Sequence, residues 1–328
     1  MQKTVIIALA VVGTLTAGFF LFRNQPVTPA TGLKNIYNQW KAEYGIKVGA
    51  AEDDYRFKVF ASNYARINKH NALGKSYKLG LNAFTHLTNE EFTATHLGLK
   101  LQKTKNTNAT VVGAAADKAD WRDKMNPAKD QGQCGSCWAF STIGAVEGAF
   151  SVLKNNLMDL SEQELVDCSG SYGNEGCNGG LMDNGFQYII AKKGIATEKE
   201  YPYTAVDGTC NTKQTTRNAP ITGYTDVKEG SSEALKAALT VQPVSVAIEA
   251  DTYTFQSYSS GVINDDSCGT NLDHGVVAVG FDATANPPYY IVRNSWGTSW
   301  GNKGHVYIGI QDGDGICGIQ KMASYPTL

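Results

Sequence analysis

The spacing of apolar residues predicts a helical unit over residues 33–97. In residues 53–71, apolar side chains recur every three or four positions, as they do on one face of a helix, and residues 33–45 repeat the pattern. Thr88 stands before two glutamates, an arrangement that caps the start of a further short helix. Residues 100–118 are polar or small and follow no period, which is typical of a linker that proteases cut.

The pattern changes beyond residue 120. Residues 137–156 have apolar positions spaced as in a long buried helix, and Ser161 with Glu164 forms the capping box of a second helix. Residues 231–240 begin a third helix. Runs of β-branched and aromatic residues then predict strands at 243–250, 274–281, 288–296 and 305–310. Helices followed by strands indicate an α+β fold with two subdomains.

The N-terminus has the pattern of a secretory signal. Residues 5–22 are uncharged and mostly apolar between Lys3 and Arg23, and small residues at Ala17 and Gly18 provide a cleavage site. We therefore expect a signal peptide at residues 1–17. A run of this length is also long enough to remain as an uncleaved membrane anchor. Either way the chain enters the secretory pathway, where disulfides persist. The linker contains the chain's only N-glycosylation sequon, which begins at Asn108.

Composition and total charge describe an ordinary globular protein. Hydrophobic residues make up 42% and charged residues 18%, and the net charge of -2 gives no indication of a nucleic-acid partner. The charge is unevenly distributed: residues 1–114 have 14 Lys and Arg against 6 Asp and Glu, and residues 115–328 have 15 against 25. The resulting +8 and -10 fit two surfaces that face each other, or a chance drift in surface charge.

The chain has seven cysteines, all of them beyond residue 133. An odd number in a secreted protein indicates a reactive thiol or an intermolecular bond. Three disulfides and one free thiol is the simplest count, and the count does not say which thiol is free.

Two of the cysteines, Cys134 and Cys137, form a Cys-x-x-Cys pair. A redox dithiol of the thioredoxin type would need a βαβ context before it, and a structural zinc site would need a second ligand pair, but the sequence has neither. The two cysteines can instead have separate roles. Cys137 stands at the start of a predicted helix, whose partial positive charge favours a thiolate. The alternative is a buried, unreactive thiol.

Three motifs identify the family that the chain resembles. Cys134-Gly-Ser-Cys137-Trp is followed 137 residues later by His274, within LDHGVVAVGF, and then by Asn294, within VRNSWGTSWG. From about residue 33 to its end, the chain is similar to papain-family cysteine proteases of the cathepsin L type. The resemblance implies a papain-like fold with a helical left subdomain and a β-barrel-like right subdomain. It also implies an inhibitory propeptide at residues 18–114 before a mature enzyme at 115–328.

The resemblance assigns roles at the site. Cys137 matches the nucleophile, His274 the base that takes its proton, and Asn294 the residue that orients the imidazole. Gln131 matches the side-chain donor of the oxyanion hole, which acts with the backbone N–H of Cys137. Trp296 matches the indole that shields the bond between Asn294 and His274 from water.

Further positions match the binding cleft and the disulfides. Gly179 and Gly180 match the strip along which an extended peptide binds, because they have no side chains to obstruct it. An apolar pocket would accept the side chain two residues before the cut, with a preference for apolar or aromatic residues, and is formed by Met182, Ala247, Leu272 and Met322. The family pattern pairs Cys134 with Cys177, Cys168 with Cys210, and Cys268 with Cys317, which leaves Cys137 free.

The front section matches the family's inhibitory propeptide at two motifs. The first is kept at every position, namely Glu52, Arg56, Phe60, Asn63, Ile67 and Asn71. The second begins with Gly80, Asn82 and Phe84, but His86 stands where relatives have an aspartate. Because histidine titrates near pH 6.5, the pH at which the precursor opens depends on His86.

These features predict a zymogen that becomes an endopeptidase acting through a covalent thioester. We expect no metal and no cofactor, and a monomer whose partners are polypeptide substrates and its own propeptide. We expect no stable membrane association after processing, and a location in a lysosome- or food-vacuole-like compartment or outside the cell. Two alternatives are a binding protein that has lost catalysis, which the intact site residues disfavour, and an exopeptidase, which would need an inserted loop in the cleft.

Overall fold

The computed structural model describes residues 30–101, 113–213 and 215–328. The predicted signal peptide with its cleavage site, and the sequon at Asn108, lie outside the described residues. No helix within those three ranges is long and apolar enough to cross a bilayer. We call residues 30–101 the front unit and residues 113–328 the body.

The front unit consists of three helices and one strand. These are α1 (Ala30–Glu43), α2 (Asp53–Asn71), β1 (Tyr77–Leu79) and α3 (Asn89–His96). Aromatic side chains of α1 and α2 pack together, with the Tyr37, Trp40 and Phe60 rings buried. The expectation of an all-helical unit over residues 33–97 is therefore wrong at β1. Strand β1 is stabilised by pairing with β5 of the body, so the neighbouring residues in the sequence show no pattern that predicts it.

The helical subdomain of the body is built around α4 (Cys137–Lys154). This helix packs against α5 (Glu162–Cys168) and α6 (Met182–Lys192) on one side and against the sheet on the other. It is buried on almost all faces, which explains why its sequence is apolar nearly all round. The Ser161 hydroxyl accepts the N–H of Glu164 at 3.0 Å and so caps α5. The predicted capping box is only half formed, because the Ser161 N–H donates to the Ala196 carbonyl and not to the Glu164 carboxylate.

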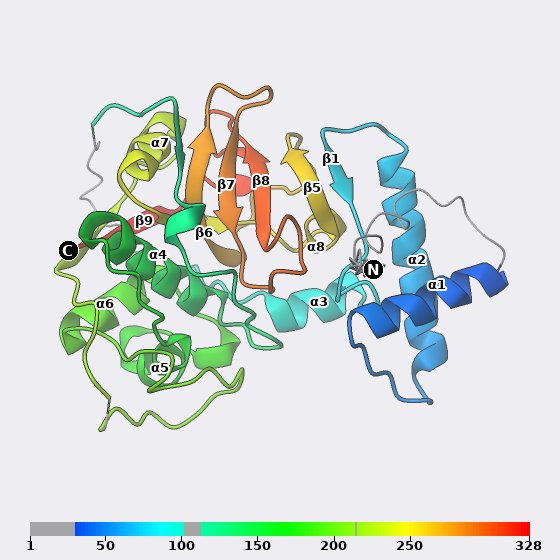
Figure 1. Ribbon diagram of the computed structural model, residues 1–328, viewed down its shortest axis with the longest axis horizontal. Helices are drawn as coiled ribbons and strands as arrows, with labels where there is room; N and C mark the ends of the chain where they lie inside the picture. Colours follow the sequence, from blue (N-terminus) through cyan, green and yellow to red (C-terminus); the bar gives the residue numbers. More distant parts are fainter. Residues whose placement is uncertain (1–29, 102–112, 214) are drawn as a thin grey trace, which may run out of the picture.

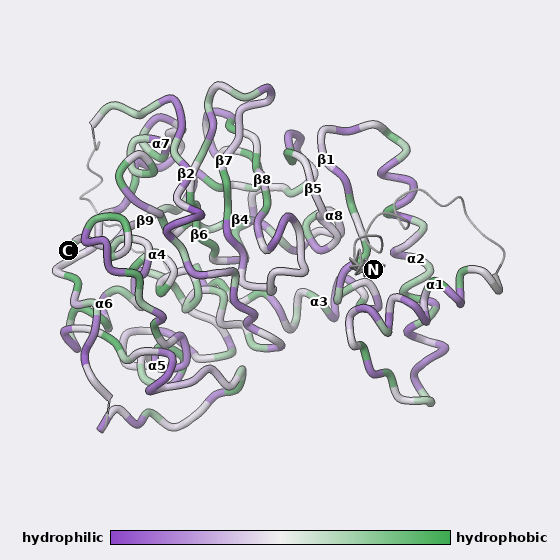
Figure 2. The backbone as a smooth tube through the Cα atoms, in the orientation of Figure 1, coloured by the Kyte–Doolittle hydropathy of each residue, from purple (hydrophilic) through white to green (hydrophobic). Residues whose placement is uncertain are grey.

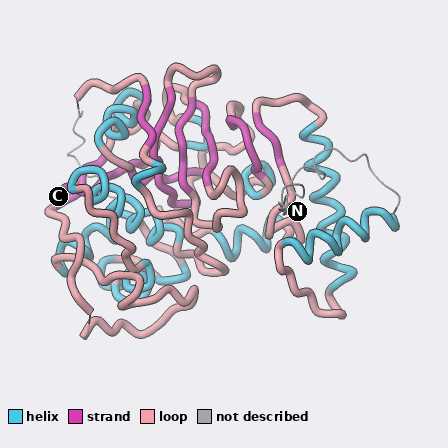
Figure 3. The backbone as a smooth tube through the Cα atoms, viewed as in Figure 1, coloured by secondary structure: helices cyan, strands magenta, loops and turns pink. Residues whose placement is uncertain are grey.

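The second subdomain is a sheet (Figure 3). Its strands are β2 (Lys118–Asp120), β3 (Gly223–Asp226), β4 (Val244–Ile248), β5 (Tyr258–Ile263), β6 (His274–Asp282), β7 (Tyr289–Arg293), β8 (His305–Gly309) and β9 (Ala323–Thr327). Two helices, α7 (Ser232–Val241) and α8 (Tyr253–Gln256), complete it. The strand order is β1-β5-β8-β7-β6-β4-β9-β3, and β2 pairs with β6. The central strand β6 is buried along almost its whole length, and Figure 2 shows hydrophobic residues along these central strands.

The front unit docks on the body at two places. Strand β1 pairs antiparallel with β5 and so extends the sheet of the body. Helix α3 then points toward the line between the helical subdomain and the sheet (Figure 1). The residues that follow α3, 97–100, form backbone hydrogen bonds with both subdomains. The front unit therefore reaches the place where α4 and β6 meet.

Candidate active site

Cys137 is the first residue of α4 and lies at the interface between the two subdomains. Its side chain is fully buried, and it is the one free cysteine of the described residues. On the opposite side, β6 begins at His274, and the N–H of Gly275 donates to the Cys137 sulfur at 3.4 Å. The start of a helix and the start of a strand therefore bring the thiol and the imidazole together.

The imidazole of His274 is held in one tautomer. Its Nε2 lies 2.8 Å from Oδ1 of Asn294, which directly follows β7. Because an amide oxygen only accepts hydrogen bonds, Nε2 bears the proton and Nδ1 of the neutral ring has a free lone pair. Nδ1 has no hydrogen-bond partner among the described residues. The Trp296 indole stacks on the imidazole at 4.7 Å between ring centroids, which covers it from water.

Gln131 presents a hydrogen-bond donor at the same place. The Ser295 hydroxyl donates to Oε1 of Gln131 at 2.7 Å and so fixes which way its amide faces. The Gln131 Nε2 then donates to the Cys134 carbonyl at 2.9 Å and to the His96 carbonyl at 3.1 Å. The His96 carbonyl belongs to the front unit. The chain itself therefore supplies an acceptor for the side-chain N–H of Gln131.

The segment after α3 occupies the cleft. Gly180 donates to the Gly98 carbonyl and accepts from the Lys100 N–H, both at 2.9 Å, and the Leu99 N–H donates to the Asp273 carbonyl at 3.0 Å. A Cβ on Gly98 would lie 2.0 Å from the carbonyl oxygen of Gly135, so the segment can pass this point only as glycine. The front unit thus blocks access to Cys137.

Leu99 packs against the same apolar cluster as the residues of the predicted pocket. This is the apolar cluster of the helical subdomain, and all four predicted pocket residues belong to or pack against that cluster, namely Met182, Ala247, Leu272 and Met322. The packing of Leu99 against this cluster was not expected from the sequence. Residues 97–101 alternate leucine with Gly or Lys, but no local feature indicates that Leu99 contacts the body.

The closed cleft keeps the thiol and the imidazole uncharged. Burial raises the pKa of the Cys137 thiol to about 12, and burial lowers the pKa of His274 to about 4. Desolvation disfavours both charged forms, and here it outweighs the helix N-terminus that would favour a thiolate. The easily ionised thiol expected from the sequence is therefore absent from this closed form.

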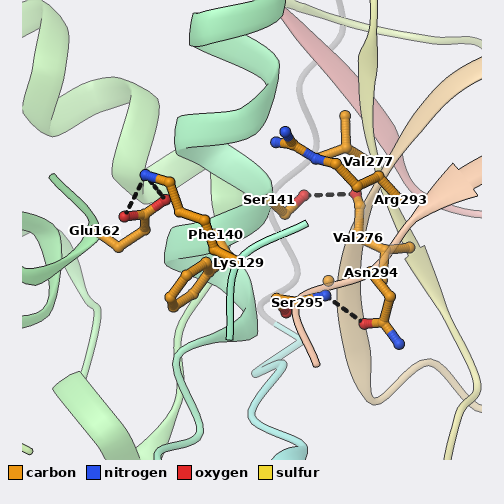
Figure 4. Close-up of a pocket in the computed structure, with 10 residues that line it drawn as sticks. Lys129, Phe140, Ser141, Glu162, Val276, Val277, Arg293, Asn294 and Ser295 are labelled. Carbon is orange, nitrogen blue, oxygen red and sulfur yellow. Dashed lines mark hydrogen bonds and ion pairs between the residues drawn. The ribbon is translucent and has the colours of Figure 1, made fainter. Parts of the chain in front are cut away.

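A cluster of buried charges lies behind the site (Figure 4). It surrounds a cavity of about 10 Å³, with room for roughly one water molecule. Lys129 lies 3.0 Å from Glu162, and Arg293 lies 3.9 Å from Glu147 of α4. Burial raises the pKa of Glu162 to about 8. Arg293 directly precedes Asn294, so the cluster fixes the strand end that presents Asn294. Sequence analysis missed this cluster, although Glu147 within an apolar helix was a signal.

Three disulfides support the site, and they are the pairs that the resemblance implies: Cys134–Cys177, Cys168–Cys210 and Cys268–Cys317. The first joins the loop of Gln131 to the loop that leads to Gly179. Within the ranges that the structure describes, no group of three or more His, Cys, Asp or Glu side chains is placed to hold a metal ion.

Comparisons with known proteins assign families to the two parts. The model of the papain family cysteine protease matches residues 115–327, and the model of the cathepsin propeptide inhibitor domain matches residues 37–92. Among curated proteins, the probable cysteine protease RD21B of Arabidopsis thaliana is 49% identical over 90% of this chain. The chain spans 66% of that relative's length. Vignain of Ricinus communis is 44% identical, over 99% of this chain and 95% of its own.

Solved structures resemble the whole described molecule. A recombinant stem bromelain precursor is 37% identical with a TM-score of 0.82, over 90% of this chain and 99% of its own. Digestive procathepsin L 3 of Tenebrio molitor larval midgut gives the same TM-score of 0.82 and 37% identity, again over 90% of this chain and 99% of its own. Both names denote precursors, and both similarities include the front unit.

Proposed function

The chain belongs to the papain family of cysteine proteases, and on this premise we propose that it is a cysteine endopeptidase made as a self-inhibited precursor. One observation carries the proposal. The Cys137 thiol accepts the N–H of Gly275, which directly follows the His274 of the His274–Asn294 pair, and the chain's own residues 96–100 bind the Gln131 amide and both sides of the cleft.

The geometry supports the following chemistry once the segment has left. Cys137 attacks the carbonyl carbon of a peptide bond, and Nδ1 of His274 takes the thiol proton while Asn294 holds Nε2. The Gln131 Nε2 and the Cys137 N–H donate to the oxyanion that forms. The C–N bond then breaks, the imidazolium protonates the leaving amine, and a thioester remains. Water activated by the imidazole hydrolyses the thioester and restores the thiol.

We propose that residues 1–17 are a signal peptide, residues 18–114 the propeptide and residues 115–328 the mature enzyme. The ranges of the two matched families support the second boundary, because one ends at residue 92 and the other begins at residue 115. The three disulfides support passage through the secretory pathway, with delivery to a lysosome- or vacuole-like compartment or outside the cell. The propeptide is the proposed intramolecular partner of a monomeric enzyme.

The enzyme is proposed to prefer an apolar or aromatic residue two positions before the cut. Leu99 supports this preference, because in the closed form it packs against the apolar cluster that includes the proposed pocket residues. A pocket of this kind distinguishes side chains by about 1–3 kcal/mol per methylene group. Its specificity is therefore broad.

The decisive experiment measures hydrolysis of a fluorogenic Phe-Arg peptide amide by the full chain after incubation at acid pH. The wild type should hydrolyse it, a thiol-alkylating reagent should abolish the activity, and Cys137→Ala should have none. A wild type that is inactive although its thiol alkylates would favour the binding protein that has lost catalysis. Full activity in Cys137→Ala would overturn the mechanism.

A further inference from the structure

The Tyr203 hydroxyl joins the two ends of the loop that provides both proposed oxyanion donors. It lies 2.8 Å from the backbone carbonyl of Gln131 and 2.6 Å from the hydroxyl of Ser136. Ser136 directly precedes Cys137, so these two contacts bracket residues 131–136. The Gln131 side chain is one oxyanion donor, and the Cys137 N–H is the other.

The direction of both hydrogen bonds follows from counting protons. A tyrosine hydroxyl has one proton, and a backbone carbonyl can only accept. Tyr203 therefore donates to Gln131. The single Ser136 proton has two acceptors in reach, and it goes to Tyr203 at 2.6 Å because the Cys134 carbonyl lies at 3.4 Å. One oxygen atom thus holds both ends of the loop at the same time.

Tyr203 is itself held in place by the helical subdomain. Its ring lies edge-on to the Phe140 ring of α4, with 4.9 Å between centroids and an interplanar angle of 82°. Its N–H donates to Oε1 of Glu198 at 2.8 Å, and the next N–H, of Thr204, donates to Oε1 of Gln163 at 2.9 Å. Burial raises the pKa of the phenol, so the hydroxyl keeps its proton at working pH.

The other atoms of Gln131 are already fixed from the sheet side. Ser295 accepts the Gln131 N–H at 2.9 Å through its carbonyl, and it donates to the side-chain oxygen at 2.7 Å through its hydroxyl. The side-chain Nε2 of Gln131 donates to the Cys134 and His96 carbonyls, and the backbone carbonyl of Gln131 accepts from Tyr203. The Gly132 N–H of the same peptide unit donates to Oδ1 of Asp130 at 2.9 Å, so Tyr203 holds the carbonyl end of this unit and Asp130 the other. Without Tyr203, we expect the carbonyl end to shift and to change the position of the amide donor relative to the Cys137 N–H.

We propose that Tyr203 is a positioning residue for the oxyanion site, which sets the distance between the Gln131 amide and the Cys137 N–H without touching substrate. This inference rests on the proposed cysteine protease function. Tyr203 affects the free energy of the transition state, because the two donors stabilise the negative charge that develops there on the substrate carbonyl oxygen. Loss of the hydroxyl should therefore lower kcat and leave KM nearly unchanged.

The test is Tyr203→Phe in the full chain, activated at acid pH and quantified by titration of its reactive thiol. We expect kcat per titrated thiol to fall about 10-fold and KM to change by less than about 2-fold. The rate of alkylation by iodoacetamide should stay within about 2-fold of the wild type, since alkylation forms no oxyanion. The control is Tyr188→Phe, which removes a hydroxyl that donates to Glu164 at 2.8 Å elsewhere in the same subdomain and should leave kcat unchanged.

A double variant tests whether Tyr203 acts through Gln131. Gln131→Ala alone should lower kcat by about 100-fold, and adding Tyr203→Phe should cost no more than about 2-fold further. An unchanged kcat in Tyr203→Phe, an equal loss of alkylation and hydrolysis, or a full 10-fold loss in the Gln131→Ala background would overturn the inference. A wild type that alkylates but hydrolyses no peptide would instead overturn the proposed function.

Discussion

The His86 ring lies half-buried in the front unit, 5.3 Å from the Trp40 ring between centroids. Burial is the main cause that lowers its pKa to about 4, and the nearby Arg56 guanidinium adds to it, against a smaller opposite effect of Glu91. An unfolded histidine titrates near pH 6.5. Between that pH and about 4, the unfolded front unit binds a proton that the folded unit does not. The free energy of unfolding therefore decreases as the pH falls through this window.

The first prediction concerns this titration. His86→Asn removes the proton uptake, so the front unit should stay docked to lower pH, and the midpoint of acid activation should move down by about half a pH unit. The measurement is the activation rate of the full chain between about pH 4 and pH 7. His305→Asn in β8, far from the front unit in sequence and also a buried histidine of lowered pKa, should leave the midpoint in place. An unshifted midpoint in His86→Asn would mean that another group controls opening.

At the scale of single residues, sequence patterns indicated the groups that we propose to react but not the residues that hold them. Cys137, His274, Asn294 and Gln131 stand in short motifs, so their convergence could be expected. The partners of Gln131 could not be expected in the same way. Its carbonyl meets Tyr203, which is 72 positions away, and a single tyrosine hydroxyl has no periodicity to reveal it.

At the scale of elements, α3 is the part of the front unit that delivers residues 97–100 to the cleft. A complete capping box starts it: the Thr88 hydroxyl accepts the Glu91 N–H at 3.2 Å, and the Glu91 carboxylate accepts the Thr88 N–H at 2.9 Å. Arg56 of α2 binds the same carboxylate at 2.6 Å. The cap therefore fixes α3 to α2 as well as closing its first turn.

The second prediction removes this cap. Thr88→Ala should lower the free energy of unfolding of the front unit by about 1 kcal/mol. The measurement is denaturant unfolding of the precursor, made inactive by Cys137→Ala so that it cannot cut itself. Thr93→Ala is the matched control, because Thr93 is a partly exposed threonine of the same helix whose hydroxyl bonds only the Glu90 carbonyl, and its change should stay within about 0.5 kcal/mol. Equal effects of both substitutions would show that the cap contributes nothing specific.

The elements themselves were predictable where their signal is local. The cap at Thr88, the helix that begins at Cys137 and the strand that begins at His274 all follow from neighbouring residues. Strand β1 was missed because it has three residues, and its hydrogen bonds come from β5, about 180 positions further along the chain. Pairing at that distance leaves no period in the sequence.

At the scale of the whole molecule, the front unit is held by backbone pairing and aromatic contacts, and little by ion pairs. The Phe84 and Phe92 rings lie nearly perpendicular to the Trp296 indole, at 5.7 and 5.0 Å between centroids. Among the ion pairs of the described residues, only two join the front unit to the body, Lys75–Asp265 and Lys100–Glu175, and both are partly exposed. The front unit and the body therefore form few direct ion pairs with each other, despite their opposite net charges.

The third prediction compares the two kinds of contact. Phe92→Ala should destabilise the docked precursor by about 3–5 kcal/mol, because it empties a fully buried site. Lys75→Ala should cost less than about 1 kcal/mol, since exposed pairs gain little in water. Denaturant unfolding of the Cys137→Ala precursor measures both. A larger loss for Lys75→Ala than for Phe92→Ala would show that charge dominates docking.

The position of Trp296 has a consequence for how opening can be observed. Its indole stacks on His274, and two rings of the front unit, Phe84 and Phe92, pack against it at nearly right angles. Departure of the front unit must expose this indole to water, which red-shifts and quenches its fluorescence. The chain therefore contains its own optical reporter of activation, readable in stopped-flow experiments on unlabelled Cys137→Ala protein after a pH jump. The emission change would time the departure of the front unit separately from any peptide-bond cleavage.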